Sequence, residues 1–468
     1  MKGSYLPGSF FLCIAIGLTA PLSPGNGDGV IARVAGFHEQ KAEAGFAVTI
    51  PQSRKPLISA TFGSPGQVYA GVNIHFVTGH EQDLDRIAAA GFKLVRMDFE
   101  WQETEPSKGT YNWSGYDELT SNLVRRNLGA IYILDYSHSL YEETVESIDP
   151  VTGKEQQDLA SPQRPESIAA FARWAAAAAR HFKGKNIIWE IWNEPNISFW
   201  KPKPDVSKYN ALALASTRAI KAEVPEALVI GPASSEVPMP FLESFLSSGI
   251  LEYLDAVSIH PYRNYAKSPE TASADYKELR KLIDRYAPAG KKDIPIISSE
   301  WGYSSFTKGI SAETQAGYIV RMQLSNLLNG IPVSIWYDWK NDGNNLAERE
   351  ENFGTVTIDL KPKQAYTAIQ VMSHELDGFT FSGRISLENE NDYLLTFQNK
   401  AGDYTICAWT VDPEHPVTMN KDIPNMSHAA ARDGYGQSFN MKTEMGKLVL
   451  DLKPLPQYIK LPRGTELK

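Results

Sequence analysis

The chain contains 468 residues, of which 42% are hydrophobic and 22% are charged, and its formal net charge at pH 7 is −9. These proportions are typical of a soluble globular protein, and the length corresponds to two or three domains. The negative charge argues against nucleic acid and against an anionic membrane surface as the main partner.

The N-terminus has the pattern of a secretory signal. Lys2 precedes an uninterrupted apolar run over residues 10–18, and small residues follow it. This run is too short to span a bilayer as a helix, so we expect a signal peptide over residues 1–20 and a secreted or periplasmic protein without a membrane span. An uncleaved anchor is the alternative. Cys407 would be the only cysteine of the mature chain, which excludes an internal disulfide.

Residues 21–65 include a stretch rich in proline and glycine, and we interpret them as a linker with a possible β-strand extension at 45–50. From residue 66 onward, short β-branched or aromatic runs alternate with longer amphipathic ones. The predicted strands cover residues 68–74, 93–99, 130–135, 186–193, 227–231, 255–260, 295–300 and 333–338.

Helical patterns fill the gaps between these strands, and the last one covers residues 364–376. Eight βα units over about 310 residues are typical of a (β/α)8 TIM barrel, which we predict for residues 66–376. An open doubly wound sheet is the competing interpretation. No G-x-G-x-x-G follows the first strand, so a nucleotide-binding version of that fold lacks support.

The character of the sequence changes after residue 376. Segments such as D-Y-L-L-T-F-Q-N and Y-T-I-C-A-W-T-V alternate with turn residues and show no helical period. This pattern predicts a C-terminal antiparallel β-domain, resembling a sandwich, over residues 377–468.

Two glutamates lie at predicted strand ends. Glu194 follows the fourth strand in W-N-E-P-N, and Glu300 ends the seventh in S-S-E-W-G. Catalytic groups of such barrels lie where strands end, and strands four and seven face each other across the mouth, so we expect both carboxylates in one cleft. Glycoside hydrolysis requires such a pair, because one group protonates the leaving oxygen while the other attacks the anomeric carbon or activates water.

Motifs for other chemistries are missing from the sequence. We find no H-E-x-x-H, no His/Cys ligand spacing and no G-x-S-x-G, and we therefore expect neither a metal nor a cofactor. The N-D-G-N-N run at residues 341–345 looks like a calcium loop, but runs of this kind are usually turns.

The motifs W-N-E-P-N and S-S-E-W-G resemble those of the clan A retaining glycoside hydrolases, most closely family 39 and then family 5. The resemblance covers residues 66–376. It implies that Glu194 is the general acid/base, that Glu300 is the nucleophile and that Asn193 holds the sugar 2-hydroxyl. It also implies substrate-binding roles for Arg96, His138, His260, Tyr262 and Trp336.

The two glutamates must have different protonation states for this reaction, so we expect their surroundings to shift their pKa values differently. Glu300 must be ionised to attack, so we expect Arg96 and the Tyr262 hydroxyl to lower its pKa. Glu194 must be protonated near neutral pH, so we expect the charge of Glu300 and the apolar walls of Trp192 and Trp200 to raise its pKa.

A further glutamate lies earlier in the same strand. Because side chains alternate along a strand, we expect Glu190, Trp192 and Glu194 to share a face. A charge in the barrel interior needs a partner, and Arg96 of the second strand is the expected partner of Glu190, which we interpret as structural.

Aromatic side chains at the predicted strand ends could stack on the flat faces of sugar rings. We expect this role for Trp336, Trp200 and Trp301. Further candidates are Trp101, Trp113, Phe199, Tyr303, Tyr337 and Trp339.

The sequence therefore predicts an exported retaining β-glycosidase that hydrolyses oligo- or polysaccharides by double displacement. A narrower interpretation is an endo-acting enzyme on an exopolysaccharide, including a polymer that the producing cell exports itself. The alternative is a non-catalytic carbohydrate-binding protein on a degenerate glycosidase barrel.

Overall fold

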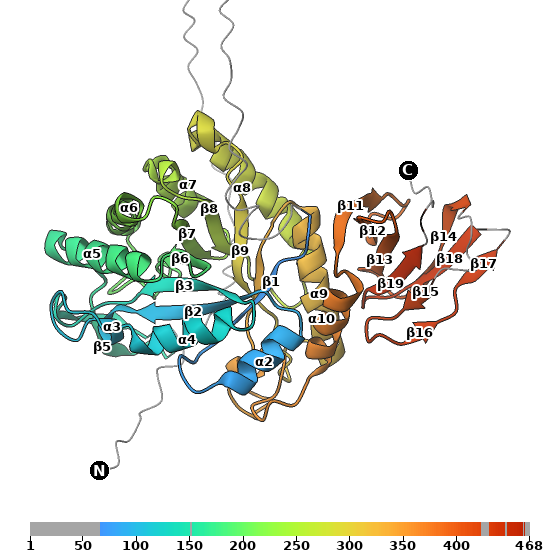
Figure 1. Ribbon diagram of the computed structural model, residues 1–468, viewed down its shortest axis with the longest axis horizontal. Helices are drawn as coiled ribbons and strands as arrows, with labels where there is room; N and C mark the ends of the chain where they lie inside the picture. The colour runs from blue at the N-terminus through green and yellow to red at the C-terminus, as the bar shows by residue number, and fades with distance from the viewer. Residues whose placement is uncertain (1–65, 150–151, 423–429, 445–446, 462, 464–468) are drawn as a thin grey trace, which may run out of the picture.

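The computed structural model describes residues 66–149, 152–422, 430–444, 447–461 and 463. These residues form a barrel and a β-domain beside it (Figure 1). The expected signal peptide, the linker and the possible strand at 45–50 lie outside the described residues. Within the described ranges, no helix has both the length and the apolar character needed to cross a membrane.

Eight parallel strands close into the predicted barrel, in the order β1-β10-β9-β8-β7-β6-β3-β2. Each predicted strand is present. Their bounds are β1 Ala70–Asn73, β2 Leu94–Glu100, β3 Gly129–Asp135, β6 Ile187–Ile191, β7 Leu228–Ser235, β8 Ala256–His260, β9 Ile296–Trp301 and β10 Ser334–Trp336.

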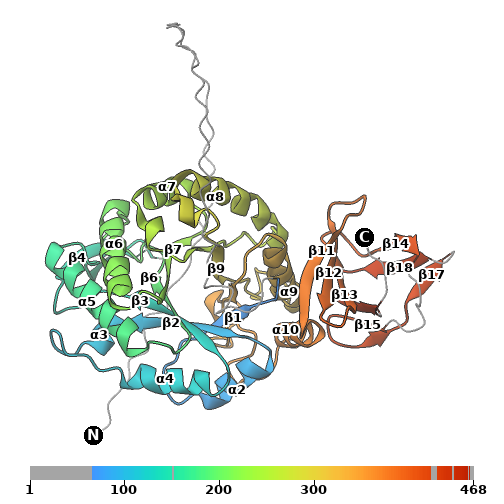
Figure 2. The same cartoon turned by 45° about the horizontal axis from the view of Figure 1, so that its top comes forward.

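Helices surround these strands as a ring (Figure 2). The main helices are α2 Glu81–Ala89, α4 Ser114–Val124, α5 Pro165–His181, α6 Val206–Glu223, α7 Met239–Ser247, α8 Ala272–Tyr286, α9 Ala312–Leu328 and α10 Gln364–Glu375, and a single turn, α3 Trp101–Thr104, follows β2. The N-terminus of α9 is capped by Ser311, whose hydroxyl accepts the Thr314 N–H at 3.0 Å. Gly330 follows the end of α9 with a φ of 73°, a conformation that favours glycine.

The barrel interior is apolar at one end and polar at the other. Leu94, Ile188 and Ala256 belong to a buried apolar cluster inside the barrel. Two or four residues further along the same strands come Arg96, Glu190 and His260, which point to the same side because side chains alternate with a period of two. The apolar layer therefore supports a polar layer at the carboxyl ends of the strands.

Two elements depart from the expected pattern of one helix per connection. The connection from β3 to α5 contains an antiparallel hairpin, β4 Thr144–Ile148 and β5 Glu155–Leu159, which the sequence analysis did not predict. An ion pair of 2.7 Å between Asp158 and Lys201 ties this hairpin to the connection after β6.

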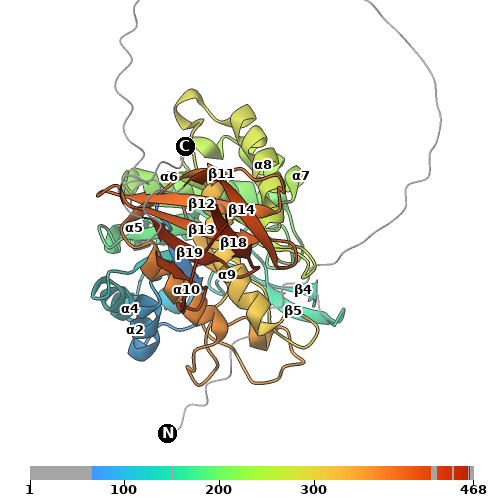
Figure 3. The same cartoon turned by 90° about the vertical axis from the view of Figure 1, so that its right-hand side faces the viewer.

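The C-terminal residues form two antiparallel sheets, as predicted, and Figure 3 views them with the barrel behind. Their strand orders are β11-β12-β13-β19-β15-β16 and β14-β18-β17. The bounds are β11 Phe379–Ile385, β12 Asp392–Asn399, β13 Tyr404–Thr410, β14 His415–Asp422, β15 Ala430–Arg432, β16 Ser438–Phe439, β17 Lys442–Glu444, β18 Lys447–Leu452 and β19 Gln457–Leu461.

The larger sheet of the β-domain shares its core with the barrel. Leu395, Phe397, Trp409 and Tyr458 are buried in the same apolar cluster as the barrel helices, including Ile369 of α10. The opposite side of this sheet packs against the smaller sheet through a separate apolar cluster. The β-domain is therefore packed directly onto the barrel.

Candidate active site

Arg96 of β2 is the centre of the polar layer. Its Nε donates to Glu190 Oε2 at 2.7 Å, and its Nη1 donates to Glu300 Oε2 at 2.6 Å. Its Nη2 donates to Asn193 Oδ1 at 2.9 Å. Burial acts to lower the pKa of Arg96, but the charges of Glu190 and Glu300 outweigh burial and raise it. The structure thus confirms Arg96 as the partner of Glu190.

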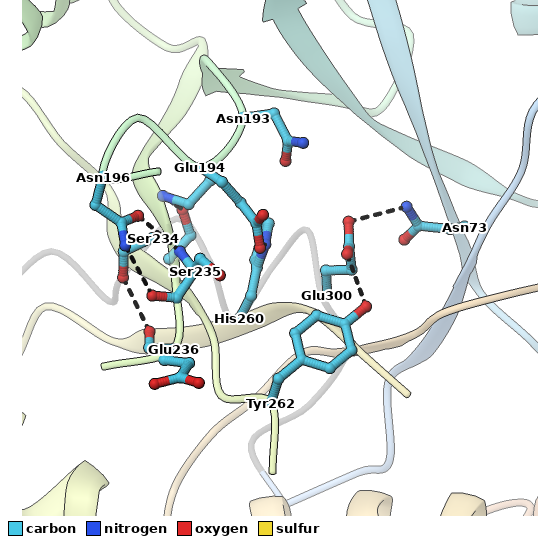
Figure 4. A network of polar contacts seen from close by, with 12 residues as sticks. Asn73, Asn193, Glu194, Asn196, Ser234, Ser235, Glu236, His260, Tyr262 and Glu300 are labelled. Carbon is cyan, nitrogen blue, oxygen red and sulfur yellow. Dashed lines mark hydrogen bonds and ion pairs between the residues drawn. The ribbon is translucent and has the colours of Figure 1, made fainter. Parts of the chain in front are cut away.

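Three neighbours donate hydrogen bonds to the carboxylate of Glu300, and Figure 4 shows those of Tyr262 and Asn73. Besides Arg96, the Tyr262 hydroxyl donates to Oε1 at 2.8 Å and Asn73 Nδ2 lies 3.4 Å from Oε2. Burial raises the pKa of Glu300, whereas Arg96 and Tyr262 lower it, and the result lies above the ordinary value. Arg96 and Tyr262 thus act in the expected direction, but desolvation outweighs them and the net shift of the Glu300 pKa is upward.

His260 connects Arg96 to Glu194. Its Nε2 lies 3.2 Å from Arg96 Nη2, which can only donate, so Nε2 must accept. The proton of the neutral ring is then on Nδ1, which donates to Glu194 Oε1 at 2.9 Å. Burial and the charge of Arg96 hold the pKa of His260 well below its ordinary value, which keeps the ring neutral.

The structure brings the two candidate catalytic glutamates together. One oxygen of Glu194, one nitrogen of His260 and one oxygen of Glu300 all lie within 4.8 Å of one another. Among the described residues, these donors alone are grouped closely enough to hold a metal ion. A cation there would face the guanidinium of Arg96, which is 2.6 Å from Glu300 and already supplies the positive charge.

Glu194 reaches this position through a turn. Strand β6 ends at Ile191, and Trp192 and Glu194 have φ values of 68° and 45°, in the left-handed region that non-glycine residues seldom occupy. The Glu194 N–H donates to Ala233 O of β7 at 3.0 Å, which fixes the turn. Strand alternation stops at Ile191, so the turn, and not the alternation we expected, places Glu194 with Glu190 in the polar layer, where Glu190 contacts Arg96 directly and Glu194 contacts it through His260.

A bulge directs Glu300 into the barrel. Ser298 and Trp301 of β9 pair with Ser334 and Trp336 of β10, so β9 has one residue more than its partner over this stretch. An extra residue reverses the alternation of side chains beyond it. Glu300 lies in this stretch and faces Arg96.

The predicted stacking tryptophans have no exposed face. Trp200, Trp301 and Trp336 are each 0% exposed. Trp200 packs against Trp192 with ring centroids 5.2 Å apart, and Trp336 Nε1 donates to Phe353 O at 3.3 Å. In this structure they form walls behind the site, which differs from the expected platform role.

The remaining aromatic candidates are also largely covered. Trp101, Phe199, Tyr303 and Trp339 are buried, whereas Trp113 and Tyr337 are intermediate.

Both ring nitrogens of His138 form hydrogen bonds with backbone groups. Its Nδ1 accepts the Leu140 N–H at 3.0 Å, so its Nε2 carries the proton and donates to Glu105 O at 2.9 Å. These bonds shape the loop after β3. In this structure His138 holds the loop after β3, and its hydrogen bonds involve neither of the two glutamates.

Three polar residues of the site were missed by the sequence analysis. Asn73 is the last residue of β1 and His75 follows this strand, and Tyr136, which follows β3, receives a hydrogen bond from Asn193 Nδ2 at 3.2 Å. His75 Nε2 lies 3.5 Å from Asp338 Oδ2, and although partial desolvation acts to lower the pKa of His75, the hydrogen bond and charge of Asp338 raise it to about 9. The available signal was a polar residue near the end of the first predicted strand, Asn73, and another directly after it, His75.

The sequence matches a known protein family and a characterised relative. The family model of cellulases, glycosyl hydrolase family 5, matches residues 61–343. A β-xylosidase from Caldicellulosiruptor saccharolyticus is 24% identical over 295 residues, which span 56% of this chain and 58% of that protein.

Two solved structures have the same fold. The family 39 glycoside hydrolase from the gut symbiont Bacteroides cellulosilyticus WH2 gives a TM-score of 0.71 at 24% identity, covering 85% of this chain and 81% of that one. A family 39 β-xylosidase from Caulobacter crescentus gives 0.61 at 16% identity, covering 85% and 96%.

The resemblance to clan A that the two glutamate motifs indicated is confirmed by these matches. The solved structures of family 39 establish the barrel with its β-domain, and the family model spans more than half of the chain. The chain thus belongs to the cellulase family, glycosyl hydrolase family 5.

Proposed function

We propose that the protein hydrolyses β-glycosides with retention of configuration, with Glu300 as nucleophile and Glu194 as general acid/base. The observation that supports this proposal is the approach of the two carboxyl groups to within 4.8 Å. Retaining enzymes need about 5 to 5.5 Å between their carboxyl groups, whereas inverting enzymes leave about 6.5 to 9.5 Å for a water molecule.

In the first step a carboxylate oxygen of Glu300 attacks the anomeric carbon while the bond to the leaving oxygen breaks. Glu194 gives its proton to that oxygen, and an ester between Glu300 and the sugar remains. Because His260 donates to Glu194 Oε1, the proton of Glu194 is directed to Oε2. Arg96 and Tyr262 hold the attacking carboxylate in place.

In the second step Glu194, now ionised, takes a proton from water. The water oxygen attacks the anomeric carbon, and the ester bond breaks to release Glu300 as a carboxylate. The reaction consumes one water molecule, and two inversions restore the original configuration. The His260 N–H stabilises the charge that Glu194 carries between the steps.

Glu300→Ala tests the nucleophile. We expect turnover of aryl β-glycosides to be lost, and external azide to restore the release of aglycone with the glycosyl azide formed in the inverted configuration. The exposed Glu278, paired with Lys281, is the control, and Glu278→Ala should retain full activity. An azide product of retained configuration would contradict the assignment.

Glu194→Ala tests the acid/base. Glycosides with poor leaving groups need protonation, so their kcat/KM should fall far more than that of activated aryl glycosides. Uniform loss across a leaving-group series would oppose this role for Glu194.

We further propose that the enzyme is exported and cleaves β-linked polysaccharides internally. The apolar run behind Lys2 supports export, and the β-xylosidase name of the curated relative supports β-linked substrates. Cell fractionation and N-terminal sequencing of the mature chain test export. Incubation with a panel of polysaccharides tests the mode of action, because internal cleavage releases oligosaccharides of mixed length and terminal cleavage releases one small sugar.

A further inference from the structure

A buried ion pair between two barrel residues holds the segment that carries Tyr262, and the β-domain adds one hydrogen bond to it. Glu270 lies in the short 3-10 helix η2, Pro269–Thr271, and Arg321 of α9 donates to both of its oxygens at 2.7 Å and 2.8 Å. Trp409 of β13 donates its indole N–H to Glu270 Oε1 at 2.8 Å. Glu270 is 7%, Arg321 3% and Trp409 0% exposed, so water cannot replace these donors.

The pair is ionised and tightly held. Burial acts to raise the pKa of Glu270, but the charge and hydrogen bonds of Arg321 outweigh burial and hold it below the ordinary value. Hydrogen bonds to a charged group in such surroundings are among the strong ones. Tyr393 stacks on Trp409 with ring centroids 4.7 Å apart and an interplanar angle of 6°, which fixes the direction of the indole N–H.

The segment of residues 261–271 is held at both of its ends. It begins directly after His260, and near that end Tyr262 donates to Glu300 at 2.8 Å. In its second half the Tyr303 hydroxyl donates to Lys267 O at 3.0 Å, and Glu270 completes the anchorage. Arg263, next to Tyr262, binds Asp275, and Glu270 is the anchor at the C-terminal end of the segment, whose release would loosen it.

We propose that Trp409 is a positioning residue for the active site. By fixing Glu270, the β-domain holds segment 261–271 and thereby keeps the Tyr262 hydroxyl on the nucleophile. The catalytic consequence rests on the proposed function, whereas the effect on segment 261–271 can be measured without turnover.

Hydrogen–deuterium exchange of Trp409→Phe tests the structural part. The substitution removes the indole N–H and keeps an aromatic ring on Tyr393. Loss of a hydrogen bond to a charged group should speed amide exchange within residues 261–271 by about tenfold to a hundredfold. Trp174→Phe is the matched control, because Trp174 is also 0% exposed and donates its indole N–H to one partner, Thr104 Oγ1, at 2.8 Å.

The catalytic part requires a double-mutant cycle with Tyr262→Phe. Trp409→Phe should lower kcat/KM for an aryl β-glycoside about tenfold in the natural background, and should have no further effect once the Tyr262 hydroxyl is absent. If Trp409→Phe acted only through a general loss of stability, the double variant would instead show the product of the two single fold-decreases in kcat/KM. For the control pair, Trp174→Phe and Tyr262→Phe, the fold-change in kcat/KM of the double variant should equal the product of the two single fold-changes.

Each outcome separates this inference from the proposed function. Unchanged exchange in residues 261–271 of Trp409→Phe, or a multiplicative cycle, overturns the positioning role and leaves hydrolysis by the two glutamates intact. A chain that turns over no glycoside refutes the proposed function, and the exchange measurement still decides the role of Trp409. If Trp409→Phe does not fold, Glu270→Gln replaces it, because it keeps an acceptor for Trp409 while weakening the anchorage by Arg321.

Discussion

Arg96 determines the relative position of both glutamates. Its planar guanidinium donates in a fork, so one side chain can bind Glu190 behind it and Glu300 in front of it. Its remaining nitrogen faces Asn193 and His260, and His260 in turn binds Glu194. A lysine has a single nitrogen and could not hold these groups in one plane.

Tyr262→Phe should shift the acid side of the pH profile. Hydrolysis needs ionised Glu300, whose pKa is raised by burial, so activity is lost as the pH falls through that raised value. The Tyr262 hydroxyl lowers this pKa, and its removal should move the acid limb of kcat/KM upward by about one pH unit. The measurement is kcat/KM against pH on an aryl β-glycoside.

Tyr209→Phe provides the comparison. Its hydroxyl is also buried but donates to Ile191 O at 2.8 Å, so the acid limb should stay in place. An acid limb of Tyr262→Phe that stays in place or moves to lower pH would show that Glu300 does not control this side of the profile.

The meeting of the two glutamates could be predicted from the sequence, because both lie at the ends of barrel strands that face each other across the mouth. The direction of the Glu300 pKa could not, because it depends on how far burial exceeds the effect of the donors. The same applies to Trp200 and Trp336, whose exposure is set by neighbours distant in the sequence.

The barrel strands depend on close backbone approach where β1 meets its neighbours. A Cβ atom on Gly71 would lie 2.2 Å from Ile335 Cδ1 of β10 and 3.0 Å from Leu94 Cβ of β2. Glycine at this position therefore lets β1 close the barrel between β2 and β10.

Gly71→Ala should lower the free energy of unfolding by about 1 to 3 kcal/mol, because the methyl group overpacks the inner cluster. Denaturant unfolding followed by tryptophan fluorescence measures the change. The control is Gly290→Ala, where a Cβ atom would meet nothing within 4 Å, and its effect should stay within about 0.5 kcal/mol. Equal effects at both glycines would mean that β1 tolerates a wider spacing.

Strands of the barrel could be predicted because both of their faces are buried, which requires continuous β-branched and aromatic runs. The hairpin of β4 and β5 could not, since T-V-E-S-I and E-Q-Q-D-L are mostly polar and belong to a partly exposed hairpin. The bulge in β9 also left no mark in the sequence, because an extra residue is defined only against the paired strand.

The two parts of the molecule are joined by charges as well as by apolar packing. Glu375, at the end of α10, is buried and binds Lys460 Nζ of β19 at 2.9 Å, and Arg432 Nε of β15 lies 3.4 Å away. Burial acts to raise the pKa of Glu375, but Lys460 outweighs burial and lowers it.

Glu375→Gln should therefore destabilise the protein in a pH-dependent way. A lowered folded-state pKa adds stability above the ordinary carboxyl pKa, and this stability is lost as the pH falls through the folded value. The variant should be less stable than the natural chain by about 1 to 2 kcal/mol at pH 7, and the difference should shrink below about pH 4. Thermal unfolding across pH measures it.

Glu278→Gln is the matched surface substitution, because Glu278 pairs with Lys281 at 2.7 Å but is 58% exposed. Its effect should be close to zero at every pH. A difference for Glu375→Gln that persists unchanged in acid would mean that its cause is packing rather than charge.

The apolar cluster shared by α10 and the larger sheet decides how the chain can be divided. Detachable modules end in linkers and can be recombined with foreign partners. Here Phe397 and Trp409 would be stripped of their cover if the chain were cut after α10. Recombination, whether in evolution or in the laboratory, must therefore transfer the barrel and its β-domain together.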